Sequence, residues 1–175
     1  AFGLPFLAAV LVLANQFLLL RIDRNHRLAV VLERLGLFID MRELLIPQTT
    51  IITPNSMEAR RLALDENNED DDPTLEECAK RLLLMGCEYV LITGTHEQTP
   101  KVINTLYSER GVISSDSWAR LPGIYHGSGC TLASAIAALL AQGVDVPEAV
   151  KEAQEYTWQA LSAGFRPGMG QHIPD

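Results

Sequence analysis

The chain's most chemically suggestive stretch is a glycine-rich turn with a cysteine, placed directly before an apolar helix. It reads His126-Gly127-Ser128-Gly129-Cys130-Thr131 and runs into residues 132–140, which are rich in alanine and leucine. Glycines permit backbone angles that other residues resist, so the free N–H groups of the first helical turn can converge on one small volume. Together with the helix dipole, these N–H groups predict a site for an anion such as a phosphate.

Cys130 lies at the positive end of this predicted helix, where the thiolate form of a cysteine is favoured. Anion-binding N–H groups beside an acid–base group suit phosphoryl transfer, in which positioning and charge stabilisation supply most of the catalysis. The plain alternative is an ordinary loop before a helix, with Cys130 as a small buried apolar side chain. Because short motifs match by chance, the surrounding sequence must decide between the two interpretations.

Composition narrows the class of protein. The chain has 175 residues, 47% hydrophobic and 21% charged, and residues 1–175 are expected to be a single domain, or a large part of one that is incomplete at its N-terminus, with enough length for its own core. A net charge of −8 argues against a nucleic-acid partner, because that partner requires a basic face. The three cysteines are an odd number and form no C-x-x-C pair, which argues against a disulfide framework and against a thiolate metal site. We therefore expect a protein of a reducing compartment, the cytoplasm.

The first 20 residues are almost all apolar, about the length of a membrane helix. Pro5, Asn15 and Gln16 interrupt this run, and no basic residue precedes it as in a signal peptide. We therefore expect a buried strand and helix of an α/β core here, and no membrane partner. Leucine and valine residues at helical spacing predict a further helix over residues 25–37.

The rest of the chain alternates between helical and strand patterns. The expected elements are a helical turn over 41–46 that ends at Pro47, a strand over 50–53, a helix over 55–64, an acidic loop over 65–73, a helix over 74–85, a strand over 88–93, antiparallel strands over 102–107 and 112–118, the helix that follows Cys130 and ends near Gly143, and a last helix from Pro147 to Gly164. This order indicates the second half of a doubly wound α/β domain, with a mostly parallel sheet flanked by helices.

Two of these helices carry the sequence signature of a capping box. In each, a residue that caps a helix well is followed three positions later by a glutamate: Asn55 with Glu58, and Thr74 with Glu77. These pairs predict where the two helices begin. From the spacing alone, helix capping is a complete explanation for Asn55 and Glu58.

Three segments together resemble the ribokinase-like kinases. Thr53-Pro54-Asn55-Ser56-Met57-Glu58-Ala59 is similar to the T-P-N-x-x-E-A segment of that superfamily, and residues 90–97 are similar to its nucleotide-side strand and loop. Residues 126–135 are similar to the G-[ST]-G-C-T segment of the hydroxymethylpyrimidine and phosphomethylpyrimidine kinases of thiamine biosynthesis. Most ribokinase-like kinases, pyridoxal kinases included, have an aspartate at the position of Cys130, so the cysteine indicates the pyrimidine kinases.

The resemblance implies a role for the glycine-rich turn in the transfer step itself. Its backbone N–H groups would bind the transferring phosphoryl group, and the Cys130 thiolate would act as the base near the substrate hydroxymethyl group or phosphate. The catalytic residues implied in this way are Gly127, Ser128, Gly129 and Cys130.

The resemblance also implies where the cofactors bind. Asn55 and Glu58 would support Mg²⁺, in part through water, because amide and carboxylate oxygens suit a hard ion. Residues beside the ATP phosphates would be Thr93, Gly94 and Thr95; residues toward the nucleotide base would be Gly168 and Met169.

The implied activity is that of an ATP-dependent kinase that phosphorylates 4-amino-5-hydroxymethyl-2-methylpyrimidine and then its monophosphate. Relatives of this fold commonly dimerise, so the resemblance also implies a homodimer. One alternative is a pyridoxal or other vitamin kinase with the same fold. Another is a non-catalytic nucleotide-binding remnant, because the pyrimidine-holding G-S-D-x-S-x-G-A-G-I-Q-A-D segment of the family is not found in this chain. The family's N-terminal half does not map onto residues 1–40.

Overall fold

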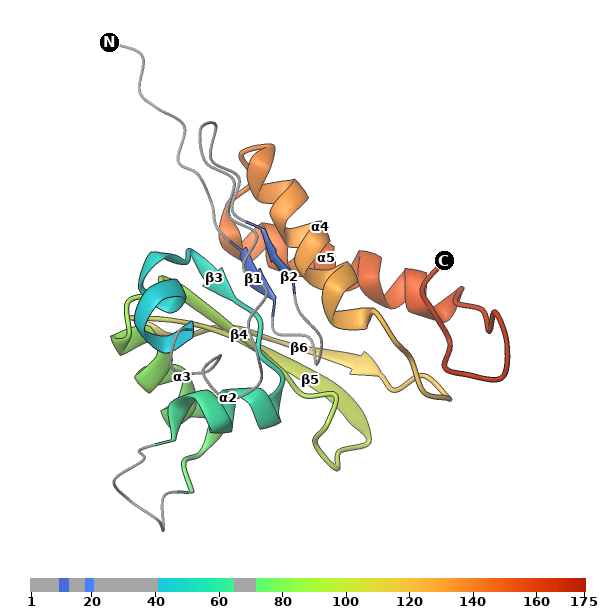
Figure 1. The fold of residues 1–175 in the computed structure, drawn as a ribbon, viewed down its shortest axis with the longest axis horizontal. Helices are drawn as coiled ribbons and strands as arrows, with labels where there is room; N and C mark the ends of the chain where they lie inside the picture. Colours follow the sequence, from blue (N-terminus) through green and yellow to red (C-terminus); the bar gives the residue numbers. More distant parts are fainter. Residues whose placement is uncertain (1–9, 13–17, 21–40, 65–71) are drawn as a thin grey trace.

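A computed structural model describes residues 10–12, 18–20, 41–64 and 72–175. Its strands are β1 (Val10–Val12), β2 (Leu18–Leu20), β3 (Ile51–Ile52), β4 (Tyr89–Thr93), β5 (Lys101–Ser108) and β6 (Gly111–Ala119). Its helices are α2 (Ser56–Ala63), α3 (Leu75–Leu84), α4 (Ser128–Ala141) and α5 (Val146–Ser162), preceded by a π-helical turn (Met41–Leu45) and a 3-10 turn (Ile46–Gln48). The described strands form one sheet in the order β2-β1-β3-β4-β5-β6 (Figure 1).

The sheet is mixed, which corrects the prediction of a mostly parallel sheet. β3 pairs in parallel with β1 and β4, whereas the β1–β2, β4–β5 and β5–β6 pairs are antiparallel. A parallel connection needs a crossover of roughly a dozen residues or more. Residues 94–100 alone join β4 to β5, and Glu109 and Arg110 alone join β5 to β6, so both connections reverse the chain. The predicted antiparallel pair over 102–107 and 112–118 is confirmed.

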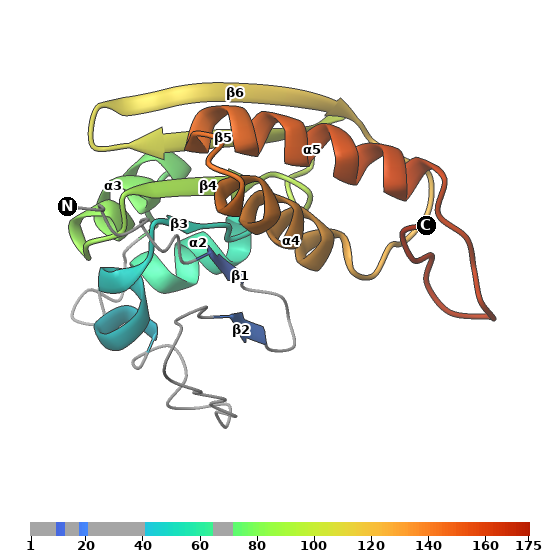
Figure 2. The ribbon, with the colours of Figure 1, turned by 90° about the horizontal axis from the view of Figure 1, so that it is seen from above.

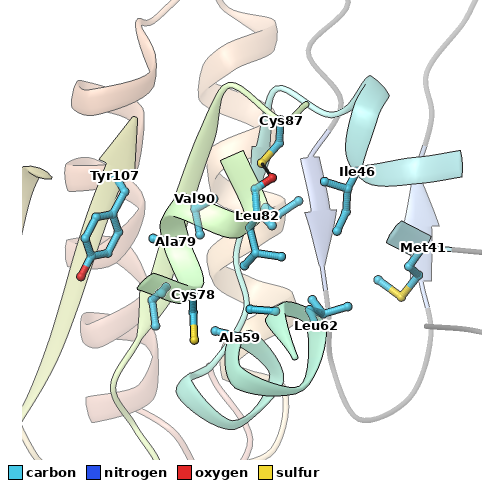
Figure 3. Close-up of a cluster of buried hydrophobic side chains, with 13 residues drawn as sticks. Met41, Ile46, Ala59, Leu62, Cys78, Ala79, Leu82, Cys87, Val90 and Tyr107 are labelled. Atoms are coloured by element: carbon cyan, nitrogen blue, oxygen red, sulfur yellow. Dashed lines mark hydrogen bonds between the residues drawn. The ribbon is translucent and has the colours of Figure 1, made fainter. Parts of the chain in front are cut away.

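Alternate residues of the central strands build a separate core on each face of the sheet. Ile52, Val90 and Ile92 belong to a buried cluster with α2 and α3 (Figure 3). Ile51 and Leu91, their neighbours in sequence, belong to a second cluster with α4 and α5. Side chains of a strand point alternately to its two faces, so both faces of this sheet need a helical cover. The predicted α/β architecture is therefore confirmed as three layers, with the helices on the two sides of the sheet (Figure 2).

The predicted capping boxes behave differently at the two helices. At α2, Asn55 Oδ1 accepts a hydrogen bond from the Glu58 N–H at 2.9 Å, and Glu58 Oε2 accepts one from the Asn55 N–H at 2.9 Å. At α3, Thr74 Oγ1 accepts from the Glu77 N–H at 3.2 Å, while the Glu77 carboxylate pairs with Arg81 along the helix. The capping box of α2 is thus complete. α3 begins where predicted, but it has the hydrogen bond to the Thr74 side chain without the return bond from Glu77.

Three element boundaries differ from the sequence-based expectations. The helical turn that begins at Met41 does not end at Pro47, because Pro47 lies in the first turn of the 3-10 segment, where no N–H is needed. The last helix begins before Pro147, at Val146, with Asp145 accepting the Glu148 N–H as its cap. The predicted strand over 50–53 is shorter, with Ile51–Ile52 in the sheet.

Several expectations for the first part of the chain lie outside the described residues. Within the apolar stretch 1–20, the described residues 10–12 and 18–20 are strands, which agrees with the strand of that expectation, whereas the burial of their side chains and the expected helix lie outside what the structure describes. The predicted helix over 25–37 and the acidic loop over 65–71 are not among the described residues. Of the helices that are described, none has both the length and the apolar character required to cross a membrane.

Candidate active site

The strand directions bring three chain connections to one edge of the sheet. β4 runs parallel to β3, and the two antiparallel pairings that follow turn β6 into the direction of β4. The C-terminal ends of β3, β4 and β6 therefore share an edge, which is where open α/β sheets bind ligands. From this edge the chain continues into α2, into the β4–β5 loop (residues 94–100) and into the linker (residues 120–127) that leads to α4 (Figure 2).

The capping box of α2 lies directly beside the end of β4. Asn55 forms a parallel bridge with Thr93, and the Thr93 N–H donates to the Pro54 carbonyl oxygen at 2.9 Å. Partial burial raises the pKa of the Glu58 carboxyl, because its desolvation outweighs the hydrogen bonds from Asn55. A half-buried carboxylate of this kind would be stabilised by a cation at the sheet edge.

The oxygen atoms of Asn55 and Glu58 fit a supporting role for Mg²⁺. Each side chain uses one oxygen in the capping box, which leaves the second Glu58 oxygen and further lone pairs for a water or an ion. Across residues 41–64 and 72–175 and the two short strands before them, no three His, Cys, Asp or Glu residues form a metal cluster. Mg²⁺ usually binds through one or two carboxylates, several waters and substrate phosphates, and seldom in a cage made of protein groups alone. One carboxylate beside one amide oxygen therefore suffices for a supporting role.

A buried polar network fixes the first residue of the β4–β5 loop. The Gly94 N–H donates to Asn104 Oδ1 at 3.1 Å, and Asn104 Nδ2 donates to Gln154 Oε1 at 2.9 Å. Gln154 also accepts from Trp118 Nε1 at 3.1 Å and donates to Asp116 Oδ2 at 3.0 Å. Asn104 and Gln154 are buried, so these bonds tie the loop to β5, β6 and α5 through groups that would be costly to leave unpaired.

The middle of the same loop is tied to α2. Glu97 Oε1 accepts from Arg60 Nη1 at 2.9 Å, and this ion pair lowers the pKa of the Glu97 carboxyl. The Ser56 hydroxyl adds to that lowering, although it has no hydrogen-bond partner of normal geometry in the described residues. Thr93 is the last residue of β4, and Gly94 and Thr95 begin the β4–β5 loop. All three were predicted to lie beside the ATP phosphates, and the loop that follows Thr93 is held through Gly94 and through Glu97.

The glycine turn forms the start of α4 as predicted. Gly127 is the N-cap residue with φ +92°, in the left-handed region that favours glycine, and its carbonyl accepts the Thr131 N–H at 2.9 Å. Ser128, Gly129 and Cys130 make the first turn, whose N–H groups have no acceptor within the helix. Gly129 and Cys130 are exposed and Ser128 is half-buried, so a ligand can approach this turn from solvent.

The C-terminal tail (residues 165–175) supports this turn from one side. The His126 N–H donates to the His172 carbonyl oxygen at 2.8 Å, and the His172 N–H donates to the Ile124 carbonyl oxygen at 2.9 Å. The Tyr125 and His172 rings also contact each other, with their centroids 5.2 Å apart. Tyr125 and His172 thus form a parallel bridge between the linker and the tail. In Figure 1 the tail lies beside the label that marks the C-terminus.

The tail residues that were predicted to face the nucleotide base point into solvent. Arg166 curls this part of the tail by donating to the carbonyl oxygens of Met169 and Gly170, each at 3.0 Å. Gly168 is exposed, and Met169 has 99% of its surface accessible. The structure thus brings the tail to the glycine turn, while the role of Gly168 and Met169 stays a prediction.

Cys130 is exposed, unlike the other two cysteines. Cys78 and Cys87 are buried, and burial raises the pKa of the Cys87 thiol to about 12. The interpretation of Cys130 as a buried apolar side chain is therefore wrong. A cavity of about 700 Å³ begins at Cys130 and runs between α4 and α5, lined among others by Ser134, Ala138 and Tyr156.

We predict that a thiol reagent labels one cysteine quickly in the folded protein. Cys130 should react within minutes, whereas the burial of Cys78 and Cys87 should delay their reaction until the protein unfolds. Intact mass after iodoacetamide treatment, with and without denaturant, gives the number of alkylated cysteines. Rapid labelling that persists in Cys130→Ala would contradict this assignment of the exposed thiol.

Sequence reasoning missed three residues that shape the site. Asn104 and Gln154 are polar residues in apolar patterns, and polar residues at buried positions are the trace that could have drawn attention to them. Among the described residues, the hydrogen-bond partners of Arg120 are backbone carbonyl groups of the β4–β5 loop, and such partners leave no pattern in the sequence.

Comparison with known proteins places these features in a family. Residues 34–175 match the family model for phosphomethylpyrimidine kinase. The chain is 38% identical over 134 residues to a hydroxymethylpyrimidine/phosphomethylpyrimidine kinase from Streptomyces coelicolor, covering 74% of this chain and 47% of the relative. It is 37% identical over 131 residues to a pyridoxine kinase from Bacillus subtilis, covering 71% of this chain and 46% of the relative. The chain thus spans about half the length of these curated relatives.

A solved structure with the same arrangement is the ADP complex of Bacillus subtilis pyridoxal kinase. It superposes with a TM-score of 0.69 at 30% sequence identity, covering 79% of this chain and 54% of that chain. The similarity therefore extends to the spatial arrangement of the sheet and helices as well as to the sequence.

Proposed function

The chain belongs to the phosphomethylpyrimidine kinase family, and on this premise we propose that it transfers phosphate from ATP to 4-amino-5-hydroxymethyl-2-methylpyrimidine and then to the resulting monophosphate. The observation that carries the proposal is Cys130, exposed in the first turn of α4 directly after a left-handed glycine turn. The N–H groups of the first turn of α4 would stabilise the charge of the transferring phosphoryl group, and the Cys130 side chain would accept a proton.

The proposed transfer step uses the glycine turn and Cys130 together. The Cys130 thiolate takes the proton of the substrate hydroxyl group as that oxygen forms a bond to the γ-phosphorus of ATP. The bond between this phosphorus and the bridging oxygen breaks, and ADP leaves with the electron pair. The N–H groups of the first turn of α4 stabilise the negative charge on the phosphoryl oxygens during transfer.

The remaining residues would bind and orient the cofactors. Mg²⁺, when bound, neutralises charge on the phosphates. Glu58 and Asn55 would hold it from the edge of the sheet, in part through water, and Thr93 lies directly beside them. The β4–β5 loop would meet the ATP phosphates at Gly94 and Thr95. We further propose a cytoplasmic enzyme that acts as a homodimer, with no nucleic-acid or membrane partner.

Measurement of ADP release tests the proposal directly. With the purified protein, MgATP and hydroxymethylpyrimidine or its monophosphate should support turnover well above the rate without substrate. Mass spectrometry should find the monophosphate and then the diphosphate. Absence of ADP release with both substrates, in a preparation that is folded by circular dichroism, would overturn the proposed function.

Pyridoxal is the second candidate substrate, favoured by the relatives rather than by the site. The pyridoxine kinase from Bacillus subtilis is 37% identical to this chain, about as similar as the pyrimidine kinase from Streptomyces coelicolor. The same assay with pyridoxal in place of the pyrimidine compares the two by their kcat/KM values. A higher kcat/KM for pyridoxal would assign pyridoxal, a form of vitamin B6, as the substrate instead.

A non-catalytic nucleotide-binding module is the third candidate, and it follows from the length of the match. The chain corresponds to about half of its curated relatives. Isothermal titration of the 175-residue chain with MgATP and with hydroxymethylpyrimidine separates this case from the kinases. Binding of nucleotide without binding of the pyrimidine or pyridoxal would favour the module.

A further inference from the structure

We propose that Arg120 is a positioning residue for ATP, holding the β4–β5 loop so that its N–H groups face the phosphates. This inference rests on the proposed function of the loop in nucleotide binding. Arg120 is the first residue after β6, outside the motifs by which the family is recognised here. It lies far from the loop in sequence and reaches it through its guanidinium group.

One guanidinium group binds three carbonyl groups of the loop. Nη1 donates to the Thr95 carbonyl oxygen at 2.8 Å, Nη2 to that of Glu97 at 3.0 Å, and Nε to that of Thr99 at 3.2 Å. The donors of arginine are fixed in a planar fork, so the three bonds define the relative positions of three alternate carbonyl groups. The compact ammonium group of lysine cannot reproduce this pattern.

The three hydrogen bonds from Arg120, called the clamp below, occupy carbonyl oxygens of the loop and involve none of its N–H groups. Within the loop, the Glu97 N–H donates to the Gly94 carbonyl at 3.1 Å, and the Thr99 N–H donates to that of Glu97 at 2.9 Å. The N–H groups of Thr95 and His96 donate no hydrogen bond inside the described part of the chain, and both residues are exposed. An anion is attracted by N–H groups and repelled by carbonyl oxygens, so a loop held in this way favours phosphate.

Arg120 also connects the two parts of the phosphate site. It begins the linker that leads to Gly127, and the other end of that linker is held by the tail through His172. The carbonyl of the preceding residue, Ala119, accepts from Trp158 Nε1 at 3.0 Å, which fixes the start of the linker against α5. The β4–β5 loop is therefore positioned by the same segment that positions the glycine turn.

The other anchors of the loop make the effect of Arg120 local. Gly94 is bonded to Asn104 and Glu97 is paired with Arg60, and neither contact involves Arg120. Arg120 is exposed, so its replacement leaves no buried group without a partner. We therefore expect the loop to lose its fixed conformation while the sheet and helices remain folded.

The test compares Arg120→Ala and Arg120→Lys with Arg110→Ala, a matched change at an exposed arginine in the turn between β5 and β6. Arg120→Ala should weaken MgATP binding roughly tenfold in isothermal titration, a loss of about the size of one charge-assisted hydrogen bond. Arg120→Lys should recover little of this loss, and Arg110→Ala should bind as the unaltered protein does. Affinity for the pyrimidine and the melting temperature should change little in all three.

Hydrogen exchange provides a readout that does not depend on ATP. Amides of residues 95–100 should exchange faster in Arg120→Ala, while those of β4 and α4 should not. Unchanged ATP affinity or unchanged exchange of the loop in Arg120→Ala, in a protein that binds ATP before substitution, would overturn the role of Arg120 alone. Failure of the unaltered protein to bind MgATP would overturn the proposed function, and this inference with it.

Discussion

Gly129→Ala is expected to lower phosphoryl-transfer turnover by on the order of 10²-fold while leaving the protein folded, because the new methyl group would occupy the space of the phosphate. A Cβ atom built at Gly129 meets no other atom within 4 Å in the described structure. Alanine is also at least as favourable as glycine in a helix. The protein itself therefore gives no reason for Gly129 to be glycine, and a bound anion at the first turn of α4 supplies one.

Gly127→Ala is the matched substitution, with a different expected outcome. Gly127 has φ +92°, and a Cβ atom there would lie 3.5 Å from Pro174 of the tail. An alanine in this conformation costs roughly 1–2 kcal/mol of strain. We expect Gly127→Ala to lower both the melting temperature and turnover, whereas Gly129→Ala lowers turnover alone.

Turnover and thermal unfolding of the two variants separate the possible results. Full activity of a stable Gly129→Ala variant would contradict a phosphate site at the first turn of α4. A loss of stability in Gly129→Ala equal to that in Gly127→Ala would mean that the glycine is required for packing instead. The comparison thus assigns the two glycines of one motif to two separate physical causes, backbone strain and ligand approach.

Sequence reasoning succeeded here where the signal is local. The capping box of Asn55 and Glu58 needs only residues three positions apart, and the hairpin between β5 and β6 needs only a short turn that ends at Gly111. The glycine turn before α4 is local in the same sense. Each of these features was predictable because the groups that stabilise it are neighbours in the chain.

The missed features depend on groups that only the fold brings together. The direction of each strand follows from the lengths of the connections, and the expectation of a mostly parallel sheet ignored how short residues 94–100 are. The bond between Asn104 and Gln154 joins β5 to α5 across 50 positions. The clamp by Arg120 uses backbone acceptors, which every residue carries. The pattern of residue types does not predict which distant residues will make such contacts.

Cys130→Ala is expected to lower turnover of hydroxymethylpyrimidine by roughly 10²- to 10³-fold, within the range for loss of a general base. Cys130 is exposed, so the substitution should change the free energy of unfolding by less than about 0.5 kcal/mol. The backbone N–H of residue 130 remains in place, so affinity for MgATP should be retained. Ser117→Ala, which changes an exposed residue of β6 outside the cavity beside Cys130, is the control and should keep full turnover.

The two successive substrates turn this variant into a test of the base itself. The hydroxymethyl group must lose a proton to become a phosphate ester, whereas the monophosphate already carries ionised oxygens near neutral pH, with a second pKa of about 6. Cys130→Ala should therefore impair the first phosphorylation far more than the second, as measured by kcat with each substrate. Equal losses on both would indicate that Cys130 acts by position or polarity, and unchanged turnover on the first would leave charge stabilisation by the N–H groups of α4 as the catalytic contribution of the turn.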